Sequence, residues 1–255
     1  ASSCTCTGAR SVSIHIAPGS LLAISDAGTL ELRSALVNMT LSNGTPLPLR
    51  GNGSSILLLG GSELSVDGDV EVEAAASAII GSPAGEPSTT ALALGRLLVA
   101  SAAVTISPTN CVLSSLESED PAASVTLNLE GQLTLTRYLS LACPVSLALG
   151  TLNATQAAAV NLTSASATLA IESDAALLVG ASHGAETILH LDSAPTVECR
   201  GELLFAAGAR LASNASAGVR VEAGGTLTLP STVEATFITV QASGTLRASL
   251  LNTLG

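Results

Sequence analysis

The chain has 255 residues, of which 47% are hydrophobic and only 1% aromatic, and its 9 basic and 20 acidic residues give a formal net charge of −11. This acidic balance disfavours nucleic acid or an anionic membrane surface as a partner, and no apolar run reaches the ~18 residues that a membrane-spanning helix needs. With so few rings, the core must consist of Leu, Val, Ile and Ala, and a wide ligand pocket rich in aromatic side chains is not expected.

The N-terminal segment, residues 1–19, is predicted to form a cap or a first strand ahead of a main domain at 20–255. It contains the alternation Ser-Val-Ser-Ile-His-Ile and ends in Ala-Pro-Gly. His15 is expected to face solvent, because no second histidine lies near it to make a metal site. The chain begins with Ala1 rather than Met, which is typical of a product left after removal of a signal peptide.

A short apolar alternation then recurs along the main domain. Alternation with a period of two predicts strands with one buried face, and repeats that cannot bury that face alone stack on their neighbours. The recurrences begin at Ser20, Ser55, Thr90, Ser124, Ala157, Thr187, Gly218 and Phe237.

Residues 124–143, SVTLNLEGQLTLTRYLSLAC, show the repeat most clearly, because they contain three such alternations in succession. No Asn-Gly or Asp-Gly pair separates them, so hairpins are not expected and the chain should turn corners instead. We therefore predict an all-β fold, a right-handed parallel β-helix of about seven coils with three short strands each. At ~4.8 Å per coil, the rod would be roughly 35 Å long.

The second coil carries a cluster of acids at Asp67, Asp69, Glu71 and Glu73. Such oxygen atoms could ligate Ca²⁺. The Asp-Gly-Asp turn and the outward alternation of the two glutamates favour a solvated acidic face instead.

Residues 107–123 are predicted to be the longest loop. Long loops on a rigid scaffold often carry binding residues, but a loop held by a disulfide and without chemical function is the reading that we favour.

The five cysteines are Cys4, Cys6, Cys111, Cys143 and Cys199. Alignment of 102–107 with 138–143 brings Cys111 near Cys143 and predicts a disulfide between them. The odd count leaves at least one cysteine free or bonded to another chain. Cys4 and Cys6 are the candidates, either for an intermolecular bond or for a bond that caps the first coil.

Six N-x-[ST] sequons predict N-glycosylation and a secreted protein. Four of them are expected in loops between coils, whereas Asn38 and Asn161 are less clearly placed. The asparagines are Asn38, Asn43, Asn52, Asn153, Asn161 and Asn214.

With these repeats, the chain resembles the pectin-lyase-like parallel β-helix superfamily at the level of architecture, over nearly all of residues 20–250. The resemblance implies a polysaccharide lyase or hydrolase, an adhesin or a surface protein, and fold alone does not choose among these. Family members that cleave polygalacturonate carry Asn-Thr-Asp, Asp-Asp, Gly-His-Gly and Arg-x-Lys motifs. None is complete here: Ser182-His183-Gly184 is the nearest approach, and the chain has no Lys.

Catalysis is therefore not expected, and no cofactor or metal is predicted. Two pairs of carboxylates, Glu172 with Asp174 and Asp67 with Asp69, could be proposed as acid and base of a hydrolase, but each reads better as a solvated corner. No G-x-S-x-G motif with a plausible base occurs. A Thr-x-Thr ice-binding ladder is also disfavoured, because the motif is missing from most repeats.

The last repeats run to the C-terminal region without a polar helix that would cover them, so an open, adhesive strand edge is expected there. Either another subunit stacks on this edge, or the natural chain continues. We predict a secreted, extracellular or cell-surface glycoprotein with N-linked glycans, which builds a filament, appendage or wall by end-to-end assembly with itself or related subunits. An adhesin or carbohydrate-binding stalk is the alternative, and a polysaccharide lyase or hydrolase is a further one.

Overall fold

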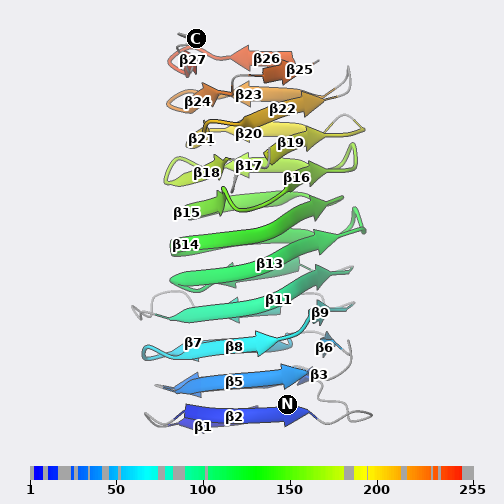
Figure 1. Ribbon diagram of the computed structural model, residues 1–255, viewed down its shortest axis with the longest axis vertical. Coiled ribbons are helices and arrows are strands. Elements are labelled where there is room, and N and C mark those ends of the chain that lie inside the picture. The colour runs from blue at the N-terminus through cyan, green and yellow to red at the C-terminus, as the bar shows by residue number, and fades with distance from the viewer. Residues whose placement is uncertain are drawn as a thin grey trace.

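The computed structural model shows a stack of parallel β-strand layers, with the first strands at one end and the last at the other (Figure 1). Every regular element in the described residues is a β-strand, which confirms the predicted all-β parallel β-helix. For β1 and most of β2 only the backbone is described. The described residues are 3–7, 11–16, 24–25, 28–33, 35–41, 46–50, 53–73, 78–82, 90–100, 103–180, 187–193, 195–213, 217–230, 232–234 and 237–248.

The strands form three faces, which we call A, B and C in the order in which the chain passes through them. Face A consists of β1 (Ser3–Thr7), β4 (Thr29–Arg33), β7 (Ser55–Leu59), β10 (Ala78–Gly81), β12 (Ala103–Ser107), the first parts of β14 (Ser124–Leu141) and β15 (Val145–Ala154), β17 (Thr168–Ile171), β20 (Thr196–Cys199), β23 (Gly218–Val221) and β26 (Phe237–Val240).

Face B follows the first corner. It consists of β2 (Ser11–Ile16), β5 (Leu36–Leu41), β8 (Glu63–Asp67), parts of β11 (Ala91–Val99), β13 (Asn110–Ser118), β14 and β15, then β18 (Ala175–Val179), β21 (Glu202–Phe205), β24 (Thr226–Leu229) and β27 (Thr245–Ala248).

Face C closes each layer. It consists of β3 (Ile24–Ser25), β6 (Leu47–Arg50), β9 (Val70–Val72), the last parts of β11, β13 and β14, then β16 (Ala159–Leu162), β19 (Thr187–Leu191), β22 (Ala209–Ser213) and β25 (Thr232–Glu234).

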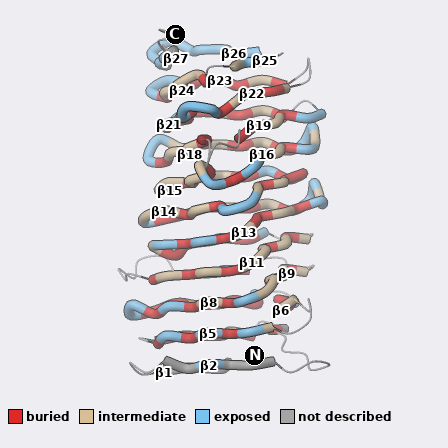
Figure 2. The backbone as a smooth tube through the Cα atoms, in the orientation of Figure 1, coloured by how far each residue is buried: buried red, intermediate tan, exposed pale blue. Residues whose placement is uncertain are grey.

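The core is a set of interior columns, each made of residues that strand pairing stacks on one another. Along face A, Val125 lies between Val104 and Val145 in one column. Along face B, Leu133 lies between Cys111 and Leu152. Inward residues are buried and their neighbours in sequence face outward, so burial alternates along most strands, as in β16 and β18 (Figure 2). Aliphatic side chains fill these columns because the narrow interior has no space for rows of rings.

The stack is longer than predicted. The pairing series on faces A and B each contain eleven strand segments among the described residues, against the predicted seven coils. At ~4.8 Å per layer the stack is roughly 50 Å long. β1 and β2 extend faces A and B by one layer, so the ladders already begin within the segment predicted as a cap or first strand.

The single coil predicted at residues 124–143 is confirmed. β14 runs without interruption from Ser124 to Leu141 and contributes to all three faces in turn. Its first part pairs with β12, its middle part with β13, and its last part with β16.

The long loop predicted at 107–123 is wrong. Asn110–Ser118 is strand β13, which supplies two faces of its layer. The prediction failed because Cys111, Leu113 and Leu116 were read as loop residues, although all three are buried in the core. No helix of the described chain is long and apolar enough to cross a membrane.

Candidate functional site

The terminal layer at the C-terminal end of the stack exposes residues that belong to interior columns. Val240 stacks on Val221 and Leu246 stacks on Leu227, and both residues below are buried. Val240 is nevertheless 39% exposed and Leu246 is 46% exposed, because no described layer covers them. Figure 2 shows β26 and β27 as exposed tube at the top of a stack whose interior is buried.

The same layer has an open backbone edge. Among the described residues, β26 pairs only with β23, and β27 pairs only with β24. The outer N–H and C=O groups of both strands therefore have no strand partner within the described part of the chain. Unpaired edges with exposed apolar residues are the usual template for the addition of another strand, so this surface is the strongest candidate for a functional contact. We call it the open layer.

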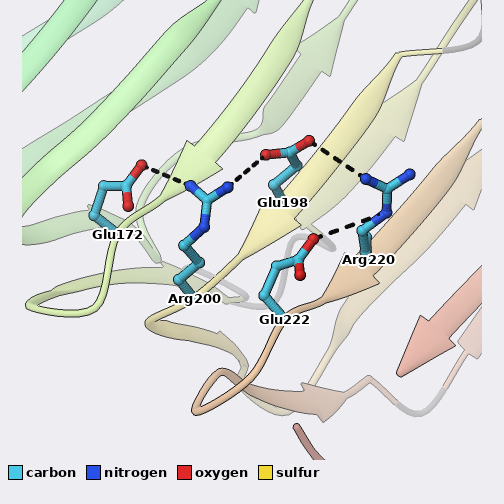
Figure 3. Close-up of polar contacts among 5 residues, drawn as sticks. All are labelled: Glu172, Glu198, Arg200, Arg220 and Glu222. Carbon is cyan, nitrogen blue, oxygen red and sulfur yellow. Dashed lines mark hydrogen bonds and ion pairs between the residues drawn. The ribbon is translucent and has the colours of Figure 1, made fainter. Parts of the chain in front are cut away.

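Ionic side chains form a column on the outside of face A in three consecutive layers (Figure 3). The guanidinium of Arg200 is bracketed by two carboxylates, with its Nη1 2.9 Å from Oε1 of Glu172 and its Nη2 3.1 Å from Oε2 of Glu198. Arg220 lies farther from its partners, with its Nη1 3.7 Å from Oε1 of Glu198 and its Nε 3.9 Å from Oε1 of Glu222. Parallel pairing produces this arrangement, because it places residues from successive coils directly above one another.

The electrostatics of this column favour charged arginine. A hydrogen bond from Arg200 to Glu172 and the negative charge of that carboxylate raise the pKa of the guanidinium. Arg50 is a parallel case on face C, since its hydrogen bonds to the carboxylate of Glu73 raise its pKa as well. These exposed pairs link side chains of neighbouring layers.

A polar hollow of about 490 Å³ lies at the corner between faces B and C. Asp69 anchors Arg96 there through two contacts, to the guanidinium at 3.0 Å and to the backbone N–H at 3.1 Å. Arg137 and Tyr138 from the coil of β14 line the same hollow, and Arg137 is exposed. The hollow therefore combines carboxylate, guanidinium and phenol groups in one accessible place.

In each acid pair considered for catalysis, one carboxylate forms an ion pair with arginine. Asp69 pairs with Arg96, and Glu172 pairs with Arg200. Glu73, from the predicted acidic face, pairs with Arg50. Among the described residues, no group of three or more His, Cys, Asp or Glu could hold a metal ion. Ser182, His183 and Gly184 lie outside the described residues.

The cysteine pairing that was predicted is not supported. Cys111 and Cys143 are free and buried, as is Cys199. The alignment behind the prediction was wrong, because Val104–Ile106 pair with residues of face A in β14, whereas Tyr138–Leu141 pair with face C of β13. Cys111 fills an interior column of face B, and Cys143 lies at the corner that follows β14.

Burial makes these thiols weak acids. Desolvation raises the pKa of Cys111 and of Cys143. It raises the pKa of Cys199 to about 11. They therefore behave as small apolar side chains of the core. Cys4 and Cys6 lie on β1, and their side chains are outside the described part of the chain.

Three sequons can be placed, and all lie on strands. Asn38 is exposed on β5, Asn153 lies on β15 and not in the predicted loop, and Asn161 lies within β16. The side-chain oxygen of Asn153 accepts hydrogen bonds from the backbone N–H of Thr155 at 3.0 Å and from its hydroxyl at 2.7 Å. Asn43, Asn52 and Asn214 are outside the described residues.

The ionic column and the hollow at Arg96 were not predicted from the sequence. The signal for the ionic column was the recurrence of Glu-x-Arg and Arg-x-Glu in different repeats, at 198–200 and 220–222. Comparison with protein-family models, with curated proteins and with solved structures finds no match.

Proposed function

We propose that the chain is a structural β-solenoid that assembles end to end through its open layer, as a building block of an extracellular filament, appendage or wall. The exposure of Val240 and Leu246, in columns whose other described side chains are buried, carries the proposal. Covering apolar surface stabilises a contact by about 25 cal/mol per Å², and a further layer would also pair the open backbone edge. A head-to-tail contact of this kind generates filaments when it does not close.

Secretion and N-glycosylation are part of this proposal. Asn38 supports them best, because it points outward from face B and is exposed on a strand. A glycan on an outward residue leaves the interior columns and both ends of the stack free. The resemblance to the pectin-lyase-like superfamily fits a scaffold as well as an enzyme, since the superfamily includes surface proteins.

The experiment is electron microscopy of the purified 255-residue chain, with size-exclusion chromatography beside it. We expect filaments with an axial repeat of roughly 50 Å, one subunit per stack. Val240→Asp should reduce filaments to single subunits, because a charge would be buried in the joint. Thr239→Asp, which alters an outward residue of the same strand, is the matched control and should still assemble. A wild-type chain that stays monomeric at all concentrations would overturn the proposal.

A carbohydrate-binding stalk is the second candidate, and the hollow at Arg96 favours it. An aromatic ring, carboxylates and guanidinium groups together suit a sugar, since the ring packs on its apolar face and the polar groups bind its hydroxyls. Tyr138 is the chain's only tyrosine and lies in this hollow. A glycan-binding screen of the wild type and of Tyr138→Ala tests it. Binding that is lost in the variant would support the stalk, and no binding to any glycan would remove it.

A further inference from the structure

The layers of this stack are polar along its axis, which restricts what can cover the open layer. Outward residues donate backbone hydrogen bonds toward the N-terminal end: the N–H of Ser55 bonds to the C=O of Gly28, and the N–H of Thr245 bonds to the C=O of Gly225. An inward residue donates toward the C-terminal end, as the N–H of Leu47 does to the C=O of Asp69.

The two ends of the stack are therefore complementary. At the C-terminal end, the backbone groups of inward residues on β26 and β27 have no strand partner in the described chain. At the N-terminal end, β1 and β2 pair only with β4 and β5 among the described residues, so the groups of their outward positions are the open ones. An N-terminal layer placed on the open layer would repeat the hydrogen bonding between every pair of layers within the stack.

The residues at the two ends also match in kind when the columns are followed through the register. Val240 belongs to the same interior column as Ile56 and Leu30, and in the first layer the backbone register carries this series to position 4 of β1. Leu246 belongs to the column that begins with Val12. The outward Thr239 belongs to the column of Ser3.

We propose that the occupant of the open layer is the N-terminal layer of a second copy of this chain, in the register that sets Val240 opposite Cys4 and Leu246 opposite Val12 of the second copy. This inference rests on the proposed end-to-end assembly and adds the partner and the register. In this register Val240 is the strand partner of position 4 and Leu246 the strand partner of position 12, and the sequence has Cys and Val at these two positions. Cross-strand pairs of these kinds stabilise a sheet.

Cysteine cross-linking tests the register. Parallel neighbours in register have Cα atoms ~4.8 Å apart, which falls within the range that a disulfide spans. Cys4 and Val240 lie on the first and last layers of the stack, so a bond between positions 4 and 240 must join two molecules (Figure 1). The buried thiols Cys111, Cys143 and Cys199 do not compete under mild oxidation, because the thiolate is the reactive form and burial raises their pKa values.

Val240→Cys is oxidised after assembly and run on a non-reducing gel. We expect a series of disulfide-linked multimers that disappears when Cys4→Ser is added and persists when Cys6→Ser is added. Thr239→Cys is the matched control on the outward side and should give no such bond to Cys4. Loss of the multimers with Cys6→Ser instead would place the strands two residues out of register and overturn the proposal.

A second pair tests face B without the native cysteines of β1. Leu246→Cys and Val12→Cys, each made in a Cys4→Ser, Cys6→Ser background, are mixed before assembly. Cross-links should form only between the two different variants.

Electron microscopy of the same samples distinguishes the proposed register from the proposed end-to-end assembly. Filaments without either cross-link would overturn the register and leave end-to-end assembly standing, whereas the absence of filaments from the wild type would overturn both.

Discussion

Arg200 and Glu172 are 28 residues apart in sequence, yet Nη1 of the arginine lies 2.9 Å from Oε1 of the glutamate one layer below. Their side chains are 42% and 38% exposed, so solvent screens the attraction. We therefore expect this ion pair to help align the two layers and to add little to stability by itself.

For this pair we expect a small coupling energy. A double-mutant cycle with Arg200→Ala and Glu172→Gln should give a coupling of less than about 1 kcal/mol in urea unfolding, and the coupling should shrink in high salt. Glu202→Gln is the control, since Glu202 is an exposed glutamate of the neighbouring β21. A coupling of several kcal/mol that is insensitive to salt would contradict this view of the column.

Interior and outward positions of β14 should respond differently to the same charge. Leu135 is fully buried, and Leu135→Asp should prevent folding because an unpaired charge would enter the packed core. Leu127→Asp should do the same. Thr134→Asp, one residue earlier and outward, should fold. Circular dichroism and yield of the soluble protein measure the difference, and a folded Leu135→Asp protein would refute the column assignment.

Substitution of two glycines that both have positive φ distinguishes the cost of backbone strain from the cost of steric crowding. Gly150 has φ of +82°, and a Cβ atom there would lie 2.2 Å from the C=O oxygen of Leu129. Gly224 has φ of +84° and open space around it. Gly224→Ala should cost about 1 kcal/mol of strain, and Gly150→Ala should cost clearly more. Urea unfolding measures both, and equal costs would show that the corner at Gly150 relaxes freely.

The thiol of Cys199 should make stability fall at alkaline pH. Its pKa in the folded state is raised to about 11 by burial, whereas the unfolded thiol ionises near pH ~8.5. A raised folded pKa contributes stability that is fully present below the unfolded pKa and is lost as pH rises toward the folded pKa. Unfolding midpoints should therefore decline between about pH 8.5 and 11, and less so in Cys199→Ala.

A labelling experiment checks the same burial directly. In the native protein at pH 8, Cys199 should resist alkylation, because the thiolate is the reactive form. It should react after unfolding in urea. Mass spectrometry of the peptide that contains Cys199 reports both states, and rapid native alkylation would contradict the buried position.

The sequence predicted the fold class because period-two alternation is present in most strands, most clearly in β14. It miscounted the coils because all three faces carry the same alternation. The recurrences at Ser55 and Ser124 fall on face A, the one at Thr90 precedes face B, and the one at Thr187 falls on face C. The face to which a strand belongs is defined only by the corners between strands. The lengths of these corners vary too much to be predicted from one sequence.

The contacts between layers were harder to predict for the same reason. Arg200 forms its contact with Glu172, which lies 28 residues earlier in the preceding layer. Glu198, two residues before Arg200, has Arg220 of the following layer as its strand partner. A one-residue change in a corner would move every outward residue of the following strand to the interior.

Because β14 forms one complete layer, we expect that a whole layer can be removed from the stack or added to it as a unit. Val145 lies in the column of Val125, which in turn stacks on Val104. We therefore expect excision of residues 125–144 to set Val145 on Val104 and Leu152 on Cys111. The length of such a rod can change by one step of ~4.8 Å at a time. Duplication or loss of one coil in the gene would therefore change the length of the rod by a whole number of layers.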